Sequence, residues 1–256
     1  MNFKGFKTLK DNRGVRIDLV MPEELQDAFF ASIYSRGSLC DEAQGAPEII
    51  WGALSSDFKG CSLVAPQQVH GVNIIDAASE NILPKRPEAD GVVLSHDPRI
   101  FASLRFADCA PVVLAGVAEE PWMAILHSGF RGTLQNIASV GMKRILEKHP
   151  TQSLQNVWAW IGPAIGGQCY SRMRDDPTTD AALAVFSPDN AVQKDDKIFF
   201  DIKGEIKRQL QGIGLICDKI YVYDICTCCS KEYFYSYRAG DGKKRMFLLA
   251  GSTARK

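Results

Sequence analysis

The sequence predicts an α+β fold in which a core of mixed β-sheet is flanked by helices. Short runs rich in Val, Ile, Leu and Phe, separated by turn residues, dominate residues 62–127. Two later segments instead repeat apolar residues every three to four positions, as amphipathic helices do. Strands follow one another without strict alternation with helices, which favours α+β over a doubly wound sheet.

The strand-rich middle of the chain accounts for most of the predicted sheet. Apolar runs predict strands at residues 62–66, 72–76, 91–95, 100–106, 111–117 and 122–127. A further strand is expected at 157–162, and the tail returns to strand-like runs at 219–225, 233–238 and 245–251. The predicted sheet therefore draws on two separate parts of the chain.

Two helices are expected between these groups of strands. Apolar residues at helical spacing run from Leu134 to Leu146, so one helix should end near His149, which precedes a proline. A second helix should begin after Asp201, a suitable N-cap, and end at Gly212 or Gly214.

Composition limits the organisation and the partners of the protein. The 256 residues are 46% hydrophobic and contain no repeat, low-complexity tract or long linker, so one domain spanning residues 1–256 is expected. Thirty basic residues balance thirty acidic ones, which offers no argument for nucleic acid or a membrane as partner. No apolar stretch resembles a signal peptide or a membrane span. We therefore expect a cytoplasmic protein that acts on a small molecule, as a monomer or small homo-oligomer.

The sharpest chemical features are polar residues placed where apolar strands end. They are His70 in PQQVHG, Asp108 and Cys109 in FADCAPVV, and His127 in AILHSGFRG. Catalytic groups commonly lie at strand ends, where the sheet fixes the backbone and the loops leave room for a ligand. A single histidine near a strand is, however, usually only a hydrogen-bonded core or rim residue, and a single cysteine a small buried side chain. Spacing alone leaves the site open.

Four motifs, QVHG, ADCAPV, HSGFRG and IGPAIGGQCY, occur in this order. Together with the pattern from CT at 226–227 through YSYR to RM at 245–246, they resemble the signature of the YfiH/DUF152 family. This family is also called the laccase-domain or multicopper polyphenol oxidoreductase family. The resemblance implies a zinc site formed by His70, Cys109 and His127.

The chemistry of this ligand set agrees with zinc. Two imidazoles and one thiolate leave a tetrahedral Zn²⁺ with one open position, as in catalytic zinc sites. Zinc lowers the pKa of bound water to about 7 and polarises substrate oxygens. A multicopper centre needs many histidines, and the chain has four. A single copper ion with a weak axial methionine is conceivable but less favoured.

The resemblance further implies a purine nucleoside phosphorylase, with adenosine deaminase and methylthioadenosine phosphorylase as additional activities. Nucleoside and phosphate would then be the partners. Asp108 is the candidate proton carrier or substrate-orienting group, although neighbours on a strand point to opposite faces, so this role requires a local bend. Arg131 is the catalytic candidate for holding an anion, unless it is an ordinary surface arginine. Arg36 and Gln68 match further family positions and are predicted to bind substrate.

Other functions use the same residues differently. Cys109 would be the nucleophile of a cysteine hydrolase with His70 or His127 as base, and some family members are linked to peptidoglycan editing. A copper-dependent polyphenol oxidoreductase is another alternative. A third is a binding module without catalysis, in which a protein ligand closes the zinc site.

Several features lie outside this proposal. CTCC at 226–229 suggests a second metal site, but no CxxC-plus-partner spacing completes it. Cys226 is therefore expected to serve packing, with Cys228 and Cys229 incidental, and Cys169 to be a packed or free pocket thiol. Residues 35–57 also depart from the family pattern, which puts the substrate loop in doubt.

Overall fold

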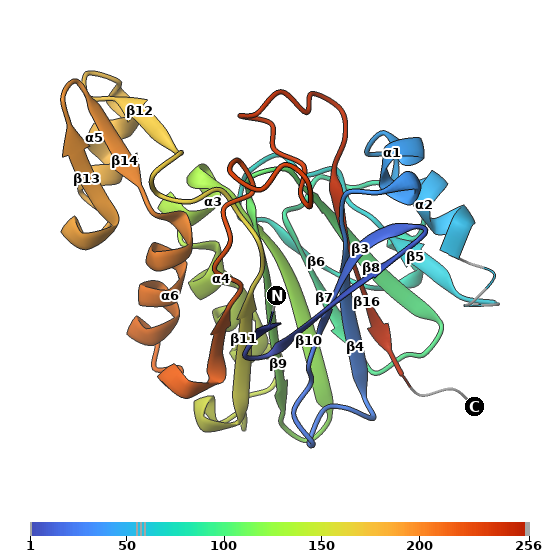
Figure 1. Cartoon of the computed structure of the whole chain (residues 1–256). Coiled ribbons are helices and arrows are strands. Elements are labelled where there is room, and N and C mark those ends of the chain that lie inside the picture. Colours follow the sequence, from blue (N-terminus) through green and yellow to red (C-terminus); the bar gives the residue numbers. More distant parts are fainter. Residues whose placement is uncertain (1, 55, 57, 59, 254–256) are drawn as a thin grey trace.

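Two β-sheets pack face to face, and helices cover the outer face of one of them (Figure 1). The computed structural model describes residues 2–54, 56, 58 and 60–253. Ser55 and Asp57, part of the divergent segment 35–57, lie outside the described residues. The predicted α+β class, with a mixed β-sheet core flanked by helices, is confirmed.

The first sheet is mainly antiparallel, with one parallel pair at its edge. Its seven strands, in spatial order, are β1 (Asn2–Phe3), β2 (Phe6–Asp11), β3 (Gly14–Leu19), β4 (Phe29–Tyr34), β16 (Met246–Ser252), β8 (Ile100–Phe106) and β5 (Ser62–Val64). The strands from the N-terminal region were not predicted, and β16 places the tail at the centre of this sheet.

The second sheet positions the chemistry. Its six strands, in order, are β15 (Ile220–Val222), β11 (Val157–Ile161), β9 (Ala110–Val117), β10 (Pro121–Ser128), β7 (Gly91–Ser95) and β6 (Ile74–Asp76). Antiparallel pairing sets His127 opposite Pro111 and Leu126 opposite Gly91. The end of β10 therefore lies beside the beginnings of both β9 and β7.

Two hydrophobic layers explain why the predicted strands read as almost continuous apolar runs. Val113 and Ile125 point into the core between the sheets, where they join residues such as Ile33. Val112 and Leu126, their neighbours in sequence, point into the second core, beneath the helices. Both faces of β9 and β10 are buried, so alternation with polar residues is lost.

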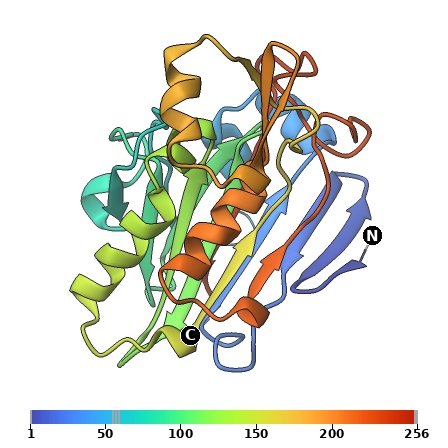
Figure 2. The ribbon, with the colours of Figure 1, turned by 90° about the vertical axis from the view of Figure 1, so that its left-hand side faces the viewer.

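Helices α4 (Ile137–Lys148) and α6 (Ile202–Gly212) lie over the outer face of the second sheet (Figure 2). Asp201 caps α6, as predicted, through a 3.1 Å bond from the backbone N–H of Gly204. The helix predicted from residue 134 is instead divided. A short α3 (Phe130–Leu134) precedes α4, because Asn136 adopts a left-handed conformation with φ of 56°.

The structure departs from the sequence interpretation most clearly in the tail. The strand predicted at 233–238 consists of loop and turns. Its alternating aromatic residues reflect burial, since Phe234 and Tyr235 are fully buried. Its backbone does not pair with a strand. The carbonyl oxygen of Tyr233 accepts bonds from the hydroxyl of Ser35 and the N–H of Arg36, and that of Phe234 accepts from the guanidinium of Arg36.

Two further units were missed. Helices α1 (Ser38–Ala43) and α2 (Pro47–Leu54) lie beside the first sheet. A three-stranded sheet of β12 (Ser171–Met173), β14 (Lys197–Phe200) and β13 (Ala191–Lys194) projects with α5 (Pro177–Leu183) at the upper left of Figure 1.

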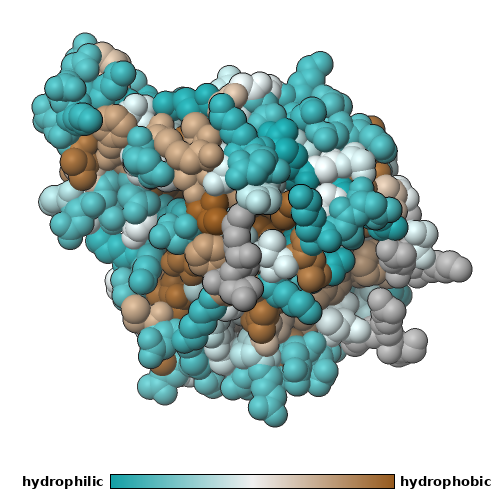
Figure 3. All heavy atoms as spheres, in the orientation of Figure 1, coloured by the Kyte–Doolittle hydropathy of each residue, from teal (hydrophilic) through white to brown (hydrophobic). Residues whose placement is uncertain are grey.

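Polar side chains cover most of the face seen in Figure 3, and apolar ones gather near its middle. Within the described part of the chain, no helix has the length and apolar character needed to cross a membrane.

Candidate active site and metal centre

His70, Cys109 and His127 meet at one end of the second sheet. Cys109 immediately precedes β9, His127 lies near the end of β10, and His70 lies in the loop between β5 and β6. One potential ligand atom from each residue lies within 4.8 Å of the other two. The imidazole rings of His70 and His127 are 4.9 Å apart and nearly perpendicular. The structure brings the three predicted ligands together, and their role as metal ligands stays a prediction.

A buried carboxylate that sequence reasoning missed holds two of these ligands. Asp90, just before β7, accepts a 2.9 Å bond from Nδ1 of His127. It also accepts backbone N–H bonds from Val69, His70 and Gly71, at 3.2, 2.9 and 2.7 Å. Burial opposes ionisation of Asp90, but the bonds from His127 and the backbone hold its pKa below the usual value. This carboxylate leaves Nε2 of His127 for the cluster, as in carboxylate–histidine–metal arrangements.

The thiol and the imidazoles shift one another's protonation. Burial alone would raise the pKa of Cys109, but charge interaction and hydrogen bonds with His127 and His70 lower it to about 6. Burial lowers the pKa of His127, but the Cys109 thiolate and Asp90 outweigh it and raise that pKa to about 9. Near neutral pH the metal-free site is therefore a thiolate beside an imidazolium, and a thiolate is the form that binds metal.

Gly129 allows the chain to pass close to this thiolate. A Cβ atom at this position would lie 2.5 Å from Sγ of Cys109 and 3.6 Å from Cδ2 of His70. Any larger residue would displace a candidate ligand. The glycine of HSGFRG is thus explained by space at the cluster.

Asp108 provides the local bend that its predicted role requires. Its φ of 82° lies in the left-handed region, so Asp108 and Cys109 both line the same cavity. The Asp108 carboxylate accepts a 2.7 Å bond from Oγ1 of Thr227 and a 2.8 Å bond from the N–H of Arg238. The bend that the predicted role of Asp108 requires is therefore present, and the carboxylate also anchors the loop that follows Thr227.

The cluster opens into a cavity of about 630 Å³ with a strongly cationic wall. Five guanidinium groups line it, from Arg105, Arg131, Arg172, Arg238 and Arg245. Burial, together with repulsion from Arg86 and Arg245, lowers the pKa of Arg105 to about 10. Such crowding of positive charge favours a bound anion. In the sequence, Arg105 is distinguished only by being a charged residue within an otherwise apolar strand.

The two other predicted substrate-binding residues lie in different places. Gln68 lines the cavity, but its amide exchanges bonds of 2.8 and 2.9 Å with the backbone of Arg105. Arg36 is not among the residues that line the cavity. Its guanidinium binds the carbonyl oxygen of Phe234 and, at 2.7 Å, the carboxylate of Asp241. A role in substrate binding stays a prediction for both.

Aromatic rings and arginines alternate along one side of the cavity. The guanidinium of Arg238 lies 5.1 Å from the ring centre of Tyr170, and that of Arg172 lies 4.9 Å from the ring centre of Phe130. Phe130 is buried, so only part of its ring reaches the cavity. Tyr237, in contrast, is 67% exposed and is the most accessible aromatic ring at this site.

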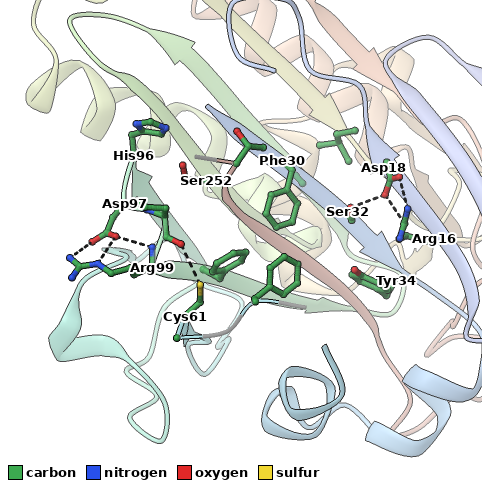
Figure 4. A pocket seen from close by; sticks show the side chains of 17 residues that line it. Arg16, Asp18, Phe30, Ser32, Tyr34, Cys61, His96, Asp97, Arg99 and Ser252 are labelled. Atoms are coloured by element: carbon green, nitrogen blue, oxygen red, sulfur yellow. Dashed lines mark hydrogen bonds and ion pairs between the residues drawn. The ribbon is translucent and has the colours of Figure 1, made fainter. Parts of the chain in front are cut away.

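A larger cavity, of about 1240 Å³, lies against the outer face of the first sheet (Figure 4). Its charges are largely paired with each other, Arg16 with Asp18 at 2.9 Å and Arg99 with Asp97 at 3.3 Å. Within the described part of the chain, no residue that lines this larger cavity belongs to a group of side chains that could hold a metal ion. We therefore assign the candidate active site to the smaller cavity.

Comparison with known proteins agrees with the sequence resemblance. The family described as multi-copper polyphenol oxidoreductase laccase matches residues 51–251, a range that contains all three candidate ligands. The chain belongs to this laccase family. Curated relatives carry a different functional name. "Purine nucleoside phosphorylase YfiH" of Shigella flexneri is 29% identical over 182 residues, which cover 70% of each chain. "Purine nucleoside phosphorylase YlmD" of Bacillus subtilis is 31% identical over 166 residues, 63% of this chain and 58% of its own.

Solved structures of YfiH and YlmD proteins share the fold. YlmD from Geobacillus stearothermophilus superposes with a TM-score of 0.77 at 22% identity, covering 96% of this chain and 99% of its own. A YfiH protein from Bacillus licheniformis gives 0.74 at 21% identity, covering 95% and 98%. The YfiH-like α+β architecture expected from the motifs is therefore confirmed.

Proposed function

We propose that this protein is a zinc-dependent purine nucleoside phosphorylase. The observation that carries the proposal is the junction of the His70, Cys109 and His127 cluster with a cavity lined by five arginines. The three-residue cluster would bind the metal ion, and the arginines of the cavity would bind phosphate. The names of the curated relatives support the same activity.

The cluster suits zinc better than copper. Two imidazoles, one of them oriented by a carboxylate, and a thiolate with lowered pKa are donors typical of catalytic zinc sites. A blue-copper site would add a weak axial methionine, and no described residue lining this cavity is methionine. Zinc held here would act as a Lewis acid toward a substrate oxygen or water.

The remaining residues have complementary roles in phosphorolysis. In this reaction a phosphate oxygen bonds to C1′ of the ribose while the bond from C1′ to the purine breaks, and the purine keeps the electron pair. Arg105 and Arg245 would bind the phosphate, with Arg131 at the more exposed side. Each oxygen of Asp108 retains a lone pair, with which the carboxylate would orient a ribose hydroxyl or receive a proton. Tyr237 offers a ring on which the purine would stack.

Two further activities belong to this proposal. Methylthioadenosine would undergo the same phosphorolysis, because the change lies at the 5′ position of the ribose. Deamination of adenosine would bring water to C6 of the base, with Asp108 as the group that moves the proton.

A nucleoside panel tests the proposal. Base release should require phosphate and should fall strongly in Cys109→Ala, His127→Ala and Arg245→Ala, but not in Arg99→Ala, an exposed arginine of the other cavity. Activity that persists in both ligand variants would reject the metal-site mechanism. Absence of base and ammonia with every nucleoside would reject the purine assignment.

One observation favours a second candidate, a cysteine hydrolase. Cys109, His127 and Asp90 form a chain of thiolate, imidazole and carboxylate like that of thiol-dependent hydrolases. Chelation should abolish zinc-dependent turnover, and zinc should restore it. Activity in metal-free protein that is lost on stoichiometric alkylation of Cys109 would instead support the hydrolase.

A further inference from the structure

A second group of potential metal ligands, formed by three cysteines, lies in the loops that hold Asp108. Cys169, Cys226 and Cys229 each offer a sulfur within 4.8 Å of the other two, and the sulfurs of Cys169 and Cys229 are 3.3 Å apart. Cys226 is almost fully buried, Cys169 half-buried and Cys229 exposed. All three are free thiols. Cys226 packs in the hydrophobic core beneath the helices, as expected, but the fold also brings Cys169 onto the CxxC pair formed by Cys226 and Cys229, which spacing in the sequence did not predict.

The backbone arranges these cysteines before any ion binds. The N–H of Gly166 donates a 3.1 Å bond to Sγ of Cys226, and the N–H of Cys229 donates to the same sulfur. The two loops that carry the cluster are also tied by a 3.1 Å bond from the N–H of Thr227 to the carbonyl oxygen of Ala164. N–H donors directed at a sulfur favour the thiolate, the form that coordinates metal.

We propose that Cys169, Cys226 and Cys229 bind a second zinc ion. Zinc–sulfur bonds of about 2.3 Å place thiolates about 3.8 Å apart in a tetrahedral site. The Cys169–Cys229 separation of 3.3 Å is close to that value, and no two of the three sulfurs lie more than 4.8 Å apart. A disulfide would need sulfurs about 2.05 Å apart and would leave the third thiol unused. The exposure of Cys229 leaves the fourth position of the ion to water.

This ion would act on the active site through the backbone, by linking two loops. It would join the loop at 164–170 to the loop at 226–230. Both loops hold Asp108, since the N–H of Ile165 donates to its carbonyl oxygen at 2.9 Å and Thr227 donates to its carboxylate. The inference does not rest on the proposed nucleoside activity, because the ligands are defined by sulfur geometry alone.

Metal content of protein purified with reductant and zinc tests the proposal. Wild type should hold two zinc ions per chain by elemental mass spectrometry. Cys229→Ser and Cys109→Ala should each hold one, and the double variant none. Cys228→Ser is the matched control from the same loop and should hold two, because Cys228 is not part of the cluster. Because the side chain of Cys229 is exposed, Cys229→Ser should fold as wild type does.

Cobalt gives a spectroscopic readout independent of activity. In the Cys109→Ala background, added Co²⁺ should produce a sulfur-to-cobalt charge-transfer band that disappears in Cys109→Ala/Cys229→Ser. Chelation should also lower the melting temperature of Cys109→Ala more than that of the double variant. Cys109→Ala protein without zinc, two zinc ions in Cys229→Ser, or a Cys169–Cys229 disulfide in protein prepared with reductant and zinc would each overturn the proposal.

Discussion

Asp90→Asn is the most informative single substitution at the candidate metal centre. The change keeps the size of the side chain but removes its charge and one of its two acceptor oxygens. One Asp90 oxygen accepts from His127 and the N–H of His70, and the other from the N–H groups of Val69 and Gly71. Whichever way the asparagine amide is placed, its NH₂ group faces two donors.

The expected loss follows from these four bonds. Hydrogen bonds to a charged group contribute about 1.5–3 kcal/mol each, so the loss of two should destabilise the metal-free protein by about 3–6 kcal/mol. The loss of a carboxylate that orients a histidine ligand should weaken zinc binding by about 10- to 100-fold. The pKa of Asp90 is lowered by folding, so its stabilising effect is present above the unfolded pKa and disappears as pH falls through the folded one. The gap in stability between wild type and variant should therefore narrow in acid.

Urea denaturation of metal-free protein across pH, together with competition for zinc against a chelator, measures both effects. Asp97→Asn is the matched control, because Asp97 binds an exposed arginine far from the cluster and should change the unfolding free energy by less than about 1 kcal/mol. A loss below about 1 kcal/mol in Asp90→Asn, with unchanged zinc affinity, would refute the assigned role.

Three further substitutions probe the site and its support. Gly129→Ala should weaken zinc binding by about 10- to 100-fold in an otherwise folded protein, because its Cβ would meet Sγ of Cys109; chelator competition measures this. Thr227→Val should lower stability by about 1.5–3 kcal/mol and slow nucleoside turnover, because Asp108 loses a 2.7 Å bond; urea denaturation and steady-state kinetics measure the two effects. Glu205→Gln should cost about 2–3 kcal/mol at neutral pH, because this fully buried carboxylate accepts bonds from Arg208, Asn190 and the N–H of Ser187. Although burial alone would raise the pKa of Glu205, these bonds lower it, so the cost should shrink as pH falls through the folded pKa.

Distinct results would contradict each expectation. Wild-type zinc affinity in Gly129→Ala would show that the backbone yields without moving the thiolate. Unchanged turnover in Thr227→Val would separate Asp108 from catalysis. A stability cost of Glu205→Gln that grows as the pH falls would show that folding does not lower the pKa of Glu205.

The sequence predicted the strands that are buried on both faces. Strands β7 to β10 agree closely with the expected ranges, because residues buried on both faces produce apolar runs that hydropathy detects directly. The strand predicted at 233–238 was wrong because burial, not strand pairing, explains its aromatic residues. The division of the predicted helix depends on a single left-handed residue, Asn136, which periodicity does not reveal.

The residues of the candidate site were also predicted only in part. The three predicted ligands converge because each lies in a motif next to a strand end. Asp90 and Arg105 were missed because their importance arises from tertiary contacts: Asp90 opens an ordinary apolar strand, and Arg105 ends one. Cys169 could not be paired with the CxxC at 226–229 from sequence, because their proximity depends on the parallel bridge between Ala164 and Cys226.

Two carboxylates, Asp90 and Asp108, support the backbone bends beside the cluster. His70 and Asp108 both have positive φ, 62° and 82°, a conformation that costs a residue other than glycine about 1–3 kcal/mol. The Asp90 carboxylate accepts a hydrogen bond from the backbone N–H of His70. The Asp108 carboxylate accepts hydrogen bonds from the hydroxyl of Thr227 and the backbone N–H of Arg238. The strained bends are thus maintained by charge-assisted bonds at the points where the ligands must turn inward. This explains why the candidate metal site and the loops that carry Asp90 and Asp108 form one unit: relaxing either bend would move a candidate ligand and release the carboxylate bonds that support it.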